Sequence, residues 1–406
     1  MAVAEQSVSQ QPFRLSMLLS DSRYRSATIQ VVALMLFMLA VAWLVSNAAS
    51  NLAALGKPLS FGFLSQPAGY DINQKLIEYN NQMSHGRAAL VGILNTLLVA
   101  VLGCITATFI GVTVGVLRLS SNWIVSRLMT VYIEGVRNVP VLLWIFLISA
   151  LLIETLPKIA SFRGDDPAGT LQFWESVAFT NVGIFVPGPV FGSGSTPVII
   201  VFVLSLIGIW IFGRWARIKQ ETTGQILPTF WIKLAILVLP AVLAFYAMGQ
   251  PISLEYPVMQ RFRFSGGFVI RNSLIALWLA LSLYTGAFIA EVVRAGIQAV
   301  SHGQTEAAFA LGMRPGRTMS LVVLPQALRV IIPPLISQYL NLTKNSSLAI
   351  AVGYMDITGT LGGITLNQTG REMESLLLLM ACYLAISITV SVFMNWYNES
   401  INMRER

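Results

Sequence analysis

The chain has 406 residues, of which 55% are hydrophobic and only 11% are charged, and its formal net charge is +8. Soluble domains usually carry about 25% charged residues, so this composition excludes an ordinary water-soluble globular protein. The basic excess does not point to nucleic acid, because Lys and Arg of membrane proteins gather in cytoplasmic loops.

The chain begins with a polar segment, residues 1–26, which we expect to be cytoplasmic. The apolar run at 27–49 is long enough to cross about 30 Å of hydrocarbon. It is longer than the core of a signal peptide and lies far from the start, so we interpret it as a retained first helix. A segment rich in Gly, Pro and Asn follows it and completes a first unit over residues 27–87.

Apolar runs of spanning length predict an all-α integral membrane protein with about eight transmembrane helices. The predicted spans are 27–49, 88–117, 128–153, 196–213, 232–250, 270–292, 329–352 and 374–396. The two cysteines, Cys104 and Cys382, lie in separate apolar runs without a nearby His or Cys. We therefore expect neither a disulfide framework nor a metal site.

The charges of the loops predict an orientation. With the N-terminus inside, the cytoplasmic segments hold fourteen Lys and Arg residues, whereas the longer external segments hold nine. An even number of spans places both termini in the cytosol, including the tail at 398–406. The external segment after the third span ends in a Pro-, Gly- and Ser-rich stretch at 186–195, which predicts a loop.

The cytoplasmic segment between the sixth and seventh predicted spans has the signals of a short helix. Ser301 and Gln304 offer an N-terminal capping box, and the Ala-rich stretch 307–311 favours helix. Gly312 supplies the left-handed residue that ends a helix, and Pro315 suits the first position of the next one. We expect a helix that lies across the cytoplasmic face and displays small residues and one acid, although any loop between spans can hold a short amphipathic helix.

This segment resembles the EAA loop of binding-protein-dependent ABC permeases. The resemblance is carried by Glu306-Ala307-Ala308, then Gly312, then Leu324-Pro325. It implies the fold of a type I ABC importer permease, whose coupling loop, here 300–328, docks into a groove on a separate ATPase subunit. By position, Glu306 would cap or pair at the docking surface, Ala307 and Ala308 would allow close approach, and Gly312 would make the turn.

The sequences that flank the loop narrow the resemblance. Residues 132–140, 284–297, 325–329 and 341–349 resemble the polar amino-acid uptake branch of that family. The likeness implies a permease domain over 88–397. Residues 154–270 insert two additional helices, within 196–250, and this insertion resembles the general L-amino-acid permease subgroup. The implied substrates are L-amino acids over a broad range, although no residue pattern names them.

Polar side chains inside the predicted spans are candidates for a translocation pathway or gate, because a charge there costs about 2.5–3.5 kcal/mol on insertion scales. Glu134 and Arg137 lie on one helix face and could pair with each other or act in gating. Lys344 could meet the α-carboxylate of the substrate, or it could fix subunit packing or a gate. The complete candidate set is Asn95, Thr96, Glu134, Arg137, Asn341, Lys344, Asn345 and Ser347.

Asn341, Lys344 and Ser347 form a polar stripe that should face the pathway or a partner subunit, whereas packing between helices explains Asn95 and Thr96 equally well. Glu291 and Arg294, at the end of the sixth span, are expected to brace the coupling loop.

The chain has no G-x-x-x-x-G-K-[ST] loop to hold nucleotide phosphates, so we expect no catalytic activity of its own and no bound cofactor. The resemblance implies ATP and Mg on two partner ATPase subunits, a second homologous or identical permease subunit, and a periplasmic solute-binding protein. It also implies the bacterial inner membrane. The alternative is an ion-coupled secondary transporter, which would predict inverted repeats that the sequence does not show.

Overall fold

The computed structural model describes residues 22–54, 56, 58–164 and 169–401. Within these residues, eight helices are long and apolar enough to cross a membrane, and each predicted run overlaps one of them. They are Tyr24–Ala54, His85–Arg118, Val141–Phe162, Ser195–Thr223, Thr229–Ala247, Asn272–Gln298, Pro315–Val352 and Glu372–Glu399. The predicted cytoplasmic segments 1–26 and 398–406 lie mostly outside the described residues.

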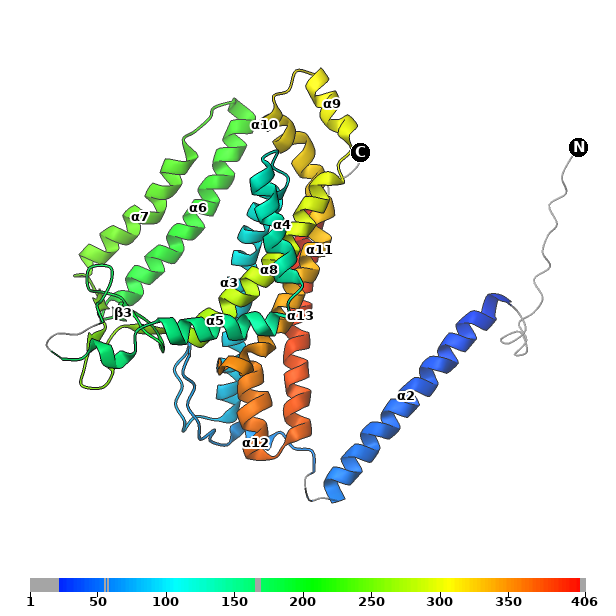
Figure 1. Cartoon of the computed structure of the whole chain (residues 1–406), viewed down its shortest axis with the longest axis vertical. Helices are drawn as coiled ribbons and strands as arrows, with labels where there is room; N and C mark the ends of the chain where they lie inside the picture. Colours follow the sequence, from blue (N-terminus) through cyan, green and yellow to red (C-terminus); the bar gives the residue numbers. More distant parts are fainter. Residues whose placement is uncertain (1–21, 55, 57, 165–168, 402–406) are drawn as a thin grey trace, which may run out of the picture.

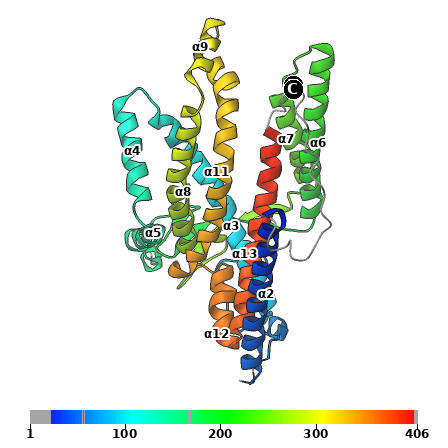
Figure 2. The ribbon, with the colours of Figure 1, turned by 90° about the vertical axis from the view of Figure 1, so that its right-hand side faces the viewer.

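The body of the molecule is built around α3 (His85–Arg118) and α8 (Asn272–Gln298), which pack along each other (Figures 1 and 2). Two glycines of α3 make this approach close, as small residues do between membrane helices. A Cβ atom added at Gly111 would lie 2.5 Å from the Cβ of Ile289, and one at Gly115 would lie 2.6 Å from the carbonyl oxygen of Ala290. α8 can therefore lie this close to α3 only because positions 111 and 115 are glycine.

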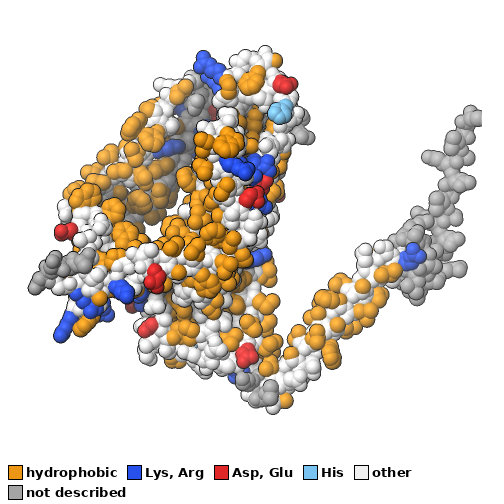
Figure 3. Space-filling model, in the orientation of Figure 1, with side chains coloured by type: hydrophobic (Ala, Val, Ile, Leu, Met, Phe, Trp, Pro, Cys, Tyr) orange, Lys and Arg blue, Asp and Glu red, His pale blue; other side chains and the backbone are white. Residues whose placement is uncertain are grey.

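Two further helices complete this body. α11 (Leu324–Asn345) packs on α8 and α3, and α13 (Glu372–Ile401) packs on α11. The core between α3, α8 and α11 contains the buried side chains of Val99, Ala107, Leu277, Leu281, Ile289 and Leu342. Hydrophobic side chains also cover the sides of the helices (Figure 3), as expected for surfaces that face lipid.

The third predicted span, 128–153, is not one helix, and that prediction is wrong. The chain forms α4 (Trp123–Arg137) and α5 (Val141–Thr155), with Pro140 at the N-cap of α5. A proline disfavours helical backbone in the residue before it and donates no amide hydrogen, so the helix breaks there. α5 lies across the direction of α3 and α13, and Figure 2 shows it end-on.

The segment between α5 and α8 holds a helical hairpin and short strands. α6 (Ser195–Thr223) and α7 (Thr229–Ala247) pack on each other and lean away from the body (Figure 1). The strands, which were not predicted, form three small antiparallel sheets. These pair β1 (Ala178–Phe179), β2 (Gly183–Val186) and β7 (Phe268–Arg271); β3 (Gly188–Phe191) and β4 (Ile252–Glu255); and β5 (Val258–Met259) and β6 (Phe264–Ser265).

The seventh predicted span begins earlier than expected and changes form at its end. α10 (Pro315–Thr318) passes through a π-helical turn, η3 (Met319–Val323), directly into α11. After α11 the chain continues as a 3-10 helix, η4 (Ser346–Val352). The connection to α13 is helical as well, with η5 (Thr358–Thr365) and α12 (Leu366–Thr369).

The two ends of the molecule carry different elements. α9 (His302–Ala310) and the connection between α6 and α7 lie at one end, and α12 lies at the other (Figures 1 and 2). The 3-10 helices η1 (Gly62–Ser65) and η2 (Ile159–Phe162) are in the loops after α2 and α5. α2 (Ser22–Ala54) stands apart from the body, and none of its most apolar window is buried.

Candidate functional site

The coupling segment forms the helix that the sequence predicts. α9 spans His302–Ala310, and the chain turns at Gly312 with a φ of +74°, the left-handed conformation that favours glycine. Ser301 is the N-cap, but its side chain makes no capping hydrogen bond, so the predicted capping box does not form. Gln304 instead accepts a long hydrogen bond from the Nε2 of Gln326, at 3.5 Å.

The exposed face of α9 carries the acid of the motif. Glu306 and Ala307 are exposed, and Glu306 makes no ion pair among the described residues. Ala308 is only 4% exposed and packs inside this chain, so any close approach it allows is to the chain itself. Leu311, next to Gly312, is 83% exposed and adds an apolar side chain to this surface; it was not among the predicted site residues.

A cavity lies beneath α9. This cavity, of about 650 Å³, separates α9 from the ends of α3 and α8, and Leu119, Ile297, His302, Phe309 and Met319 are among its lining residues. Ala308 is the one residue of α9 that is buried. The helix is thus tied to the body mainly through the chain on either side of it, which suits an element that transmits a displacement.

Leu324 and Pro325 lie inside one continuous helical segment that runs from α10 into α11. Pro325 occupies the first turn of α11, directly after the π-helical turn Met319–Val323. A proline ring clashes with the carbonyl group four residues earlier, and a wider π turn gives that group room. The chain therefore continues from α10 into α11 without a break, whereas the turn at Gly312 separates α9 from α10.

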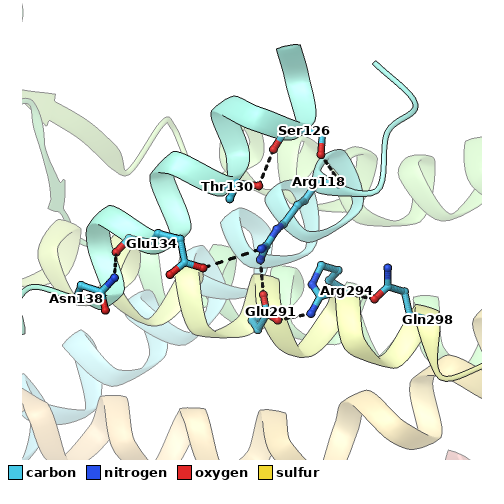
Figure 4. A network of polar contacts seen from close by, with 8 residues as sticks. All are labelled: Arg118, Ser126, Thr130, Glu134, Asn138, Glu291, Arg294 and Gln298. Atoms are coloured by element: carbon cyan, nitrogen blue, oxygen red, sulfur yellow. Dashed lines mark hydrogen bonds and ion pairs between the residues drawn. The ribbon is translucent and has the colours of Figure 1, made fainter. Parts of the chain in front are cut away.

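A polar network joins α3, α4 and α8 near the beginning of the coupling segment (Figure 4). Arg118 forms an ion pair with Glu291 and lies 4.0 Å from a carboxylate oxygen of Glu134, measured from its Nη2 atom. Glu291 also pairs with Arg294 on the next helical turn. Glu291 thus links α8 to α3 through Arg118, close to the coupling segment that Glu291 and Arg294 are expected to brace.

Of the two alternatives for Glu134 and Arg137, the pair with each other does not form in the described structure, and a gating role stays a prediction. Glu134 turns to Arg118 on α3, whereas the guanidinium group of Arg137 lies 4.9 Å from the ring centre of Phe288 on α8. Both charges belong to α4 and neither is in the apolar helix α5. The break at Pro140 removes them from the predicted span.

Asn95 and Thr96 are fully buried in α3 and hold a distant segment. Nδ2 of Asn95 donates to the carbonyl oxygens of Gln74 and Met355, at 2.7 and 2.8 Å. Oγ1 of Thr96 accepts a hydrogen bond from the amide of Ile357 at 3.2 Å. Both residues therefore join α3 to other segments of the chain, and a role for them in a translocation pathway stays a prediction.

Two residues of the predicted polar stripe, Asn341 and Lys344, lie on α11, and the third, Ser347, lies in η4. Asn341 and Lys344 are exposed, whereas Asn345 and Ser347 are half-buried. Asn341 and Lys344 continue a row of exposed positions with helical spacing along α11, which also contains Val330, Pro334 and Ser337. Lys344 makes no ion pair or side-chain hydrogen bond in the described part of the chain. A charge in this setting calls for water or a protein partner, because lipid would leave it unsolvated.

Asp356 is a buried acid that was not among the predicted site residues. Asp356 lies between the last two candidate spans and is 0% exposed. Its carboxylate accepts hydrogen bonds from Tyr383 Oη at 3.0 Å and from the amide of Gly359 at 2.8 Å. Burial raises the pKa of Asp356 to about 6, and the hydrogen bonds oppose that rise. It is the single acid in the Gly-rich stretch 353–363, and that isolation was the available signal.

Residues 222–406 match the family model described as binding-protein-dependent transport system inner membrane component. Over 97% of both chains, the sequence is 53% identical to the glutamate/glutamine/aspartate/asparagine transport system permease protein BztB of Rhodobacter capsulatus. It is 44% identical to the general L-amino acid transport system permease protein AapQ of Rhizobium johnstonii, over 95% of this chain and 94% of that one.

A crystal structure of an amino acid ABC transporter with histidines aligns with 78% of this chain and 95% of that chain, at 19% identity and a TM-score of 0.44.

Proposed function

The chain belongs to the family of binding-protein-dependent transport system inner membrane components, and from that premise we propose that ATPase subunits drive it by docking on α9. It is a multi-pass membrane permease subunit of an amino-acid ABC transporter, as the sequence resemblance implied. The ion-coupled alternative receives no support from these relatives.

One observation carries the docking proposal: α9 presents the exposed Glu306 and Ala307 at one end of the molecule, above a cavity. A partner can therefore reach the helix, and a displacement of α9 has space to occur. Two connections lead away from it, through α8 to the Arg118–Glu291 pair and through the π-helical turn into α11. A push on α9 would act on both helices.

The proposed assembly contains this chain, a second homologous or identical permease subunit, two ATPase subunits that bind ATP and Mg, and a periplasmic solute-binding protein. In this proposal, ATP is hydrolysed on the ATPase subunits, and the chain itself supplies no catalysis and holds no cofactor. The proposed location is the bacterial inner membrane with both termini in the cytosol, so that α9 faces the ATPase subunits.

We propose L-amino acids of broad range as substrates. One relative is named for glutamate, glutamine, aspartate and asparagine, and another for L-amino acids in general. Uptake of labelled glutamate, glutamine, leucine and arginine in a strain without this chain tests the range. Restoration of only the acidic and amide substrates by the chain would contradict a general specificity.

The docking proposal is tested by two substitutions on α9 and its turn, Glu306→Lys and Gly312→Asp. The first reverses the exposed charge, and the second strains a backbone that requires a positive φ while adding a charge. We expect each to lower the amount of ATPase subunit that co-purifies with the permease by about tenfold, which corresponds to about 1.4 kcal/mol. Quantitative immunoblotting of the purified complex measures this.

Glu372→Lys is the matched control, because Glu372 is also an exposed helical acid but lies in the first turn of α13, next to α12 at the opposite end of the molecule. This variant should retain the ATPase subunits. Association that is unchanged by both α9 substitutions would contradict docking on α9.

A further inference from the structure

The hairpin of α6 and α7 contains a cavity that the transport function does not use. The two helices pack on each other and stand away from the body (Figures 1 and 2). Between them lies a hollow of about 650 Å³, lined by Leu206, Ile209, Trp210, Gly213, Arg214, Arg217, Ile218 and Lys233. The basic lining residues belong to the second half of α6 and the second turn of α7, so they lie toward the end where α9 is found.

Three cations line this cavity without an acid to balance them. Arg214 and Arg217 come from α6, Lys233 comes from α7, and no carboxylate is among the lining residues. Glu221 is the nearest acid along α6, but it is exposed and forms no ion pair among the described residues. Three cations in one cavity repel each other, so the site favours an anion.

The backbone makes room for the third cation. A Cβ atom added at Gly213 would lie 3.2 Å from Nζ of Lys233 and 3.3 Å from its Cε. The side chain of Lys233 therefore crosses from α7 toward α6 over a position without a side chain. A basic end on α6 alone would satisfy the preference of cytoplasmic loops for Lys and Arg. That preference does not account for Lys233, which projects into the space between the helices.

The remaining side chains that line the cavity are apolar and belong to α6, and together we call them the apolar wall. Leu206, Ile209 and Ile218 form it together with the ring of Trp210. Exposed aromatic side chains surround this level of the hairpin, namely Trp215, Phe230 and Trp231. Trp side chains concentrate where a membrane meets water, so the cavity lies at the depth of lipid head groups.

We propose that this cavity binds an anionic phospholipid, with Arg214, Arg217 and Lys233 around the phosphate and the apolar wall against an acyl chain. Basic pockets between membrane helices hold acidic head groups in this way. Inorganic phosphate would share the cationic contacts but would leave Leu206, Ile209 and Trp210 without a partner. The apolar wall is the reason to assign the anion to a lipid.

The test uses the purified complete transporter and two probes, dioleoyl phosphatidylglycerol and dioleoyl phosphatidylcholine. Native mass spectrometry counts the lipids retained during a titration in detergent. We expect wild-type protein to retain phosphatidylglycerol selectively. We expect the variant R214Q/R217Q/K233Q to bind it about a hundredfold more weakly, because all three cations that would contact the phosphate are removed. Millimolar inorganic phosphate should not displace the lipid.

Lys219→Gln is the matched control. Lys219 is a cation of the same helix, but its Nζ lies 5.0 Å from the ring centre of Trp215 and it does not line the cavity. This variant should bind phosphatidylglycerol as wild-type protein does. If the triple variant does not assemble, the single variant K233Q replaces it, and weaker binding of phosphatidylglycerol by K233Q than by wild-type protein supports the site.

Three results would overturn the proposal. Equal retention of the two lipids by wild-type protein would remove the selectivity for an anion. Unchanged binding by K233Q and the triple variant, or equal losses in these variants and Lys219→Gln, would remove the site. Displacement of phosphatidylglycerol by inorganic phosphate would assign the cavity to the free ion.

Discussion

At the scale of single residues, Glu291 shows how one carboxylate can organise three helices. It lies on α8 about two turns before that helix ends at Gln298, and it contacts Arg118 of α3 and Arg294 of its own helix. Arg118 then reaches Glu134 of α4. Paired charges of this kind are half-exposed, so their value lies in fixing the geometry of the helices more than in raising stability.

Lys344 is the residue whose substitution separates two roles. We expect Lys344→Met to reduce uptake of labelled amino acids at least about tenfold, since a change of about 1.4 kcal/mol in a barrier already alters a rate tenfold. We expect co-purification of the second permease subunit to fall as well, because the exposed part of the polar stripe, Asn341 and Lys344, suits a subunit contact.

Lys158→Met, an exposed lysine in the loop after α5, serves as the control for Lys344. If uptake falls while assembly of the two permease subunits stays intact, Lys344 belongs to the path of the substrate. If both uptake and assembly are unaffected, neither role of Lys344 survives.

Asp356 gives a prediction about pH. Its pKa rises to about 6 in the folded chain, so the folded state binds the proton more tightly than the unfolded state does. The contribution of Asp356 is therefore most favourable below a pH of about 4 and is lost as the pH rises through 6, by an amount on the order of 3 kcal/mol.

We expect Asp356→Asn, which keeps groups for Tyr383 and Gly359 to bond, to remove this loss. The measurement is the thermal unfolding midpoint at pH 4.5 and at pH 7.5, compared between wild type and variant. Wild-type protein should lose more stability than the variant over this interval. Equal pH dependence in the two proteins would show that Asp356 does not titrate there.

At the scale of elements, the packing of α3 on α8 depends on glycine. The Cβ of any other residue at 111 would lie 2.5 Å from Ile289 and 3.0 Å from the carbonyl oxygen of Gly286. We expect Gly111→Leu to destabilise the chain by about 3 kcal/mol or more, since even modest overpacking of a core costs about 1–3 kcal/mol. The unfolding midpoint and the yield of monodisperse protein in detergent measure this.

Gly135→Leu is the control for Gly111→Leu, because a Cβ at Gly135 meets nothing within 4 Å. Both substitutions lower the intrinsic flexibility of a helix in the same way, so their difference isolates the contact. A similar effect of the two variants would mean that α3 and α8 can separate without cost.

At the scale of the whole molecule, the hairpin of α6 and α7 is a detachable unit. β3 and β4, which lead into and out of it, are paired, with Phe191 opposite Ile252. We expect replacement of residues 193–250 by an Asn-Gly turn to close this ladder as a two-residue hairpin, since that dipeptide favours the required turn. The body should keep its fold, because α6 and α7 pack mainly on each other.

The shortened chain is checked by its monodispersity in detergent and by co-purification of the ATPase subunits, with full-length protein as the reference. Removal of two helices preserves the even number of spans, so the orientation of α9 should be unchanged. Loss of ATPase binding in a well-behaved shortened chain would show that the hairpin supports the coupling end.

Much of this protein follows from its sequence alone, because lipid imposes simple rules. Helices must be apolar and long enough to satisfy their backbone across the bilayer, so eight spans could be read from composition. α9 could also be predicted, since Gly312 and the Ala-rich stretch before it act within a few residues of each other. The family followed from the motif in the same stretch, and the relatives confirm it.

The contacts of the polar and charged side chains were decided only by the tertiary structure. Glu134 pairs with Arg118 and not with Arg137 because Arg118 reaches it from α3, whereas Arg137 lies over the ring of Phe288 on α8. Asn95 bonds to Met355 because the segment at Met355 folds back onto α3. The basic cavity exists because Lys233 crosses toward Gly213 on the neighbouring helix. Each of these contacts joins residues far apart in the chain, and such contacts depend on helix packing, which local sequence does not encode.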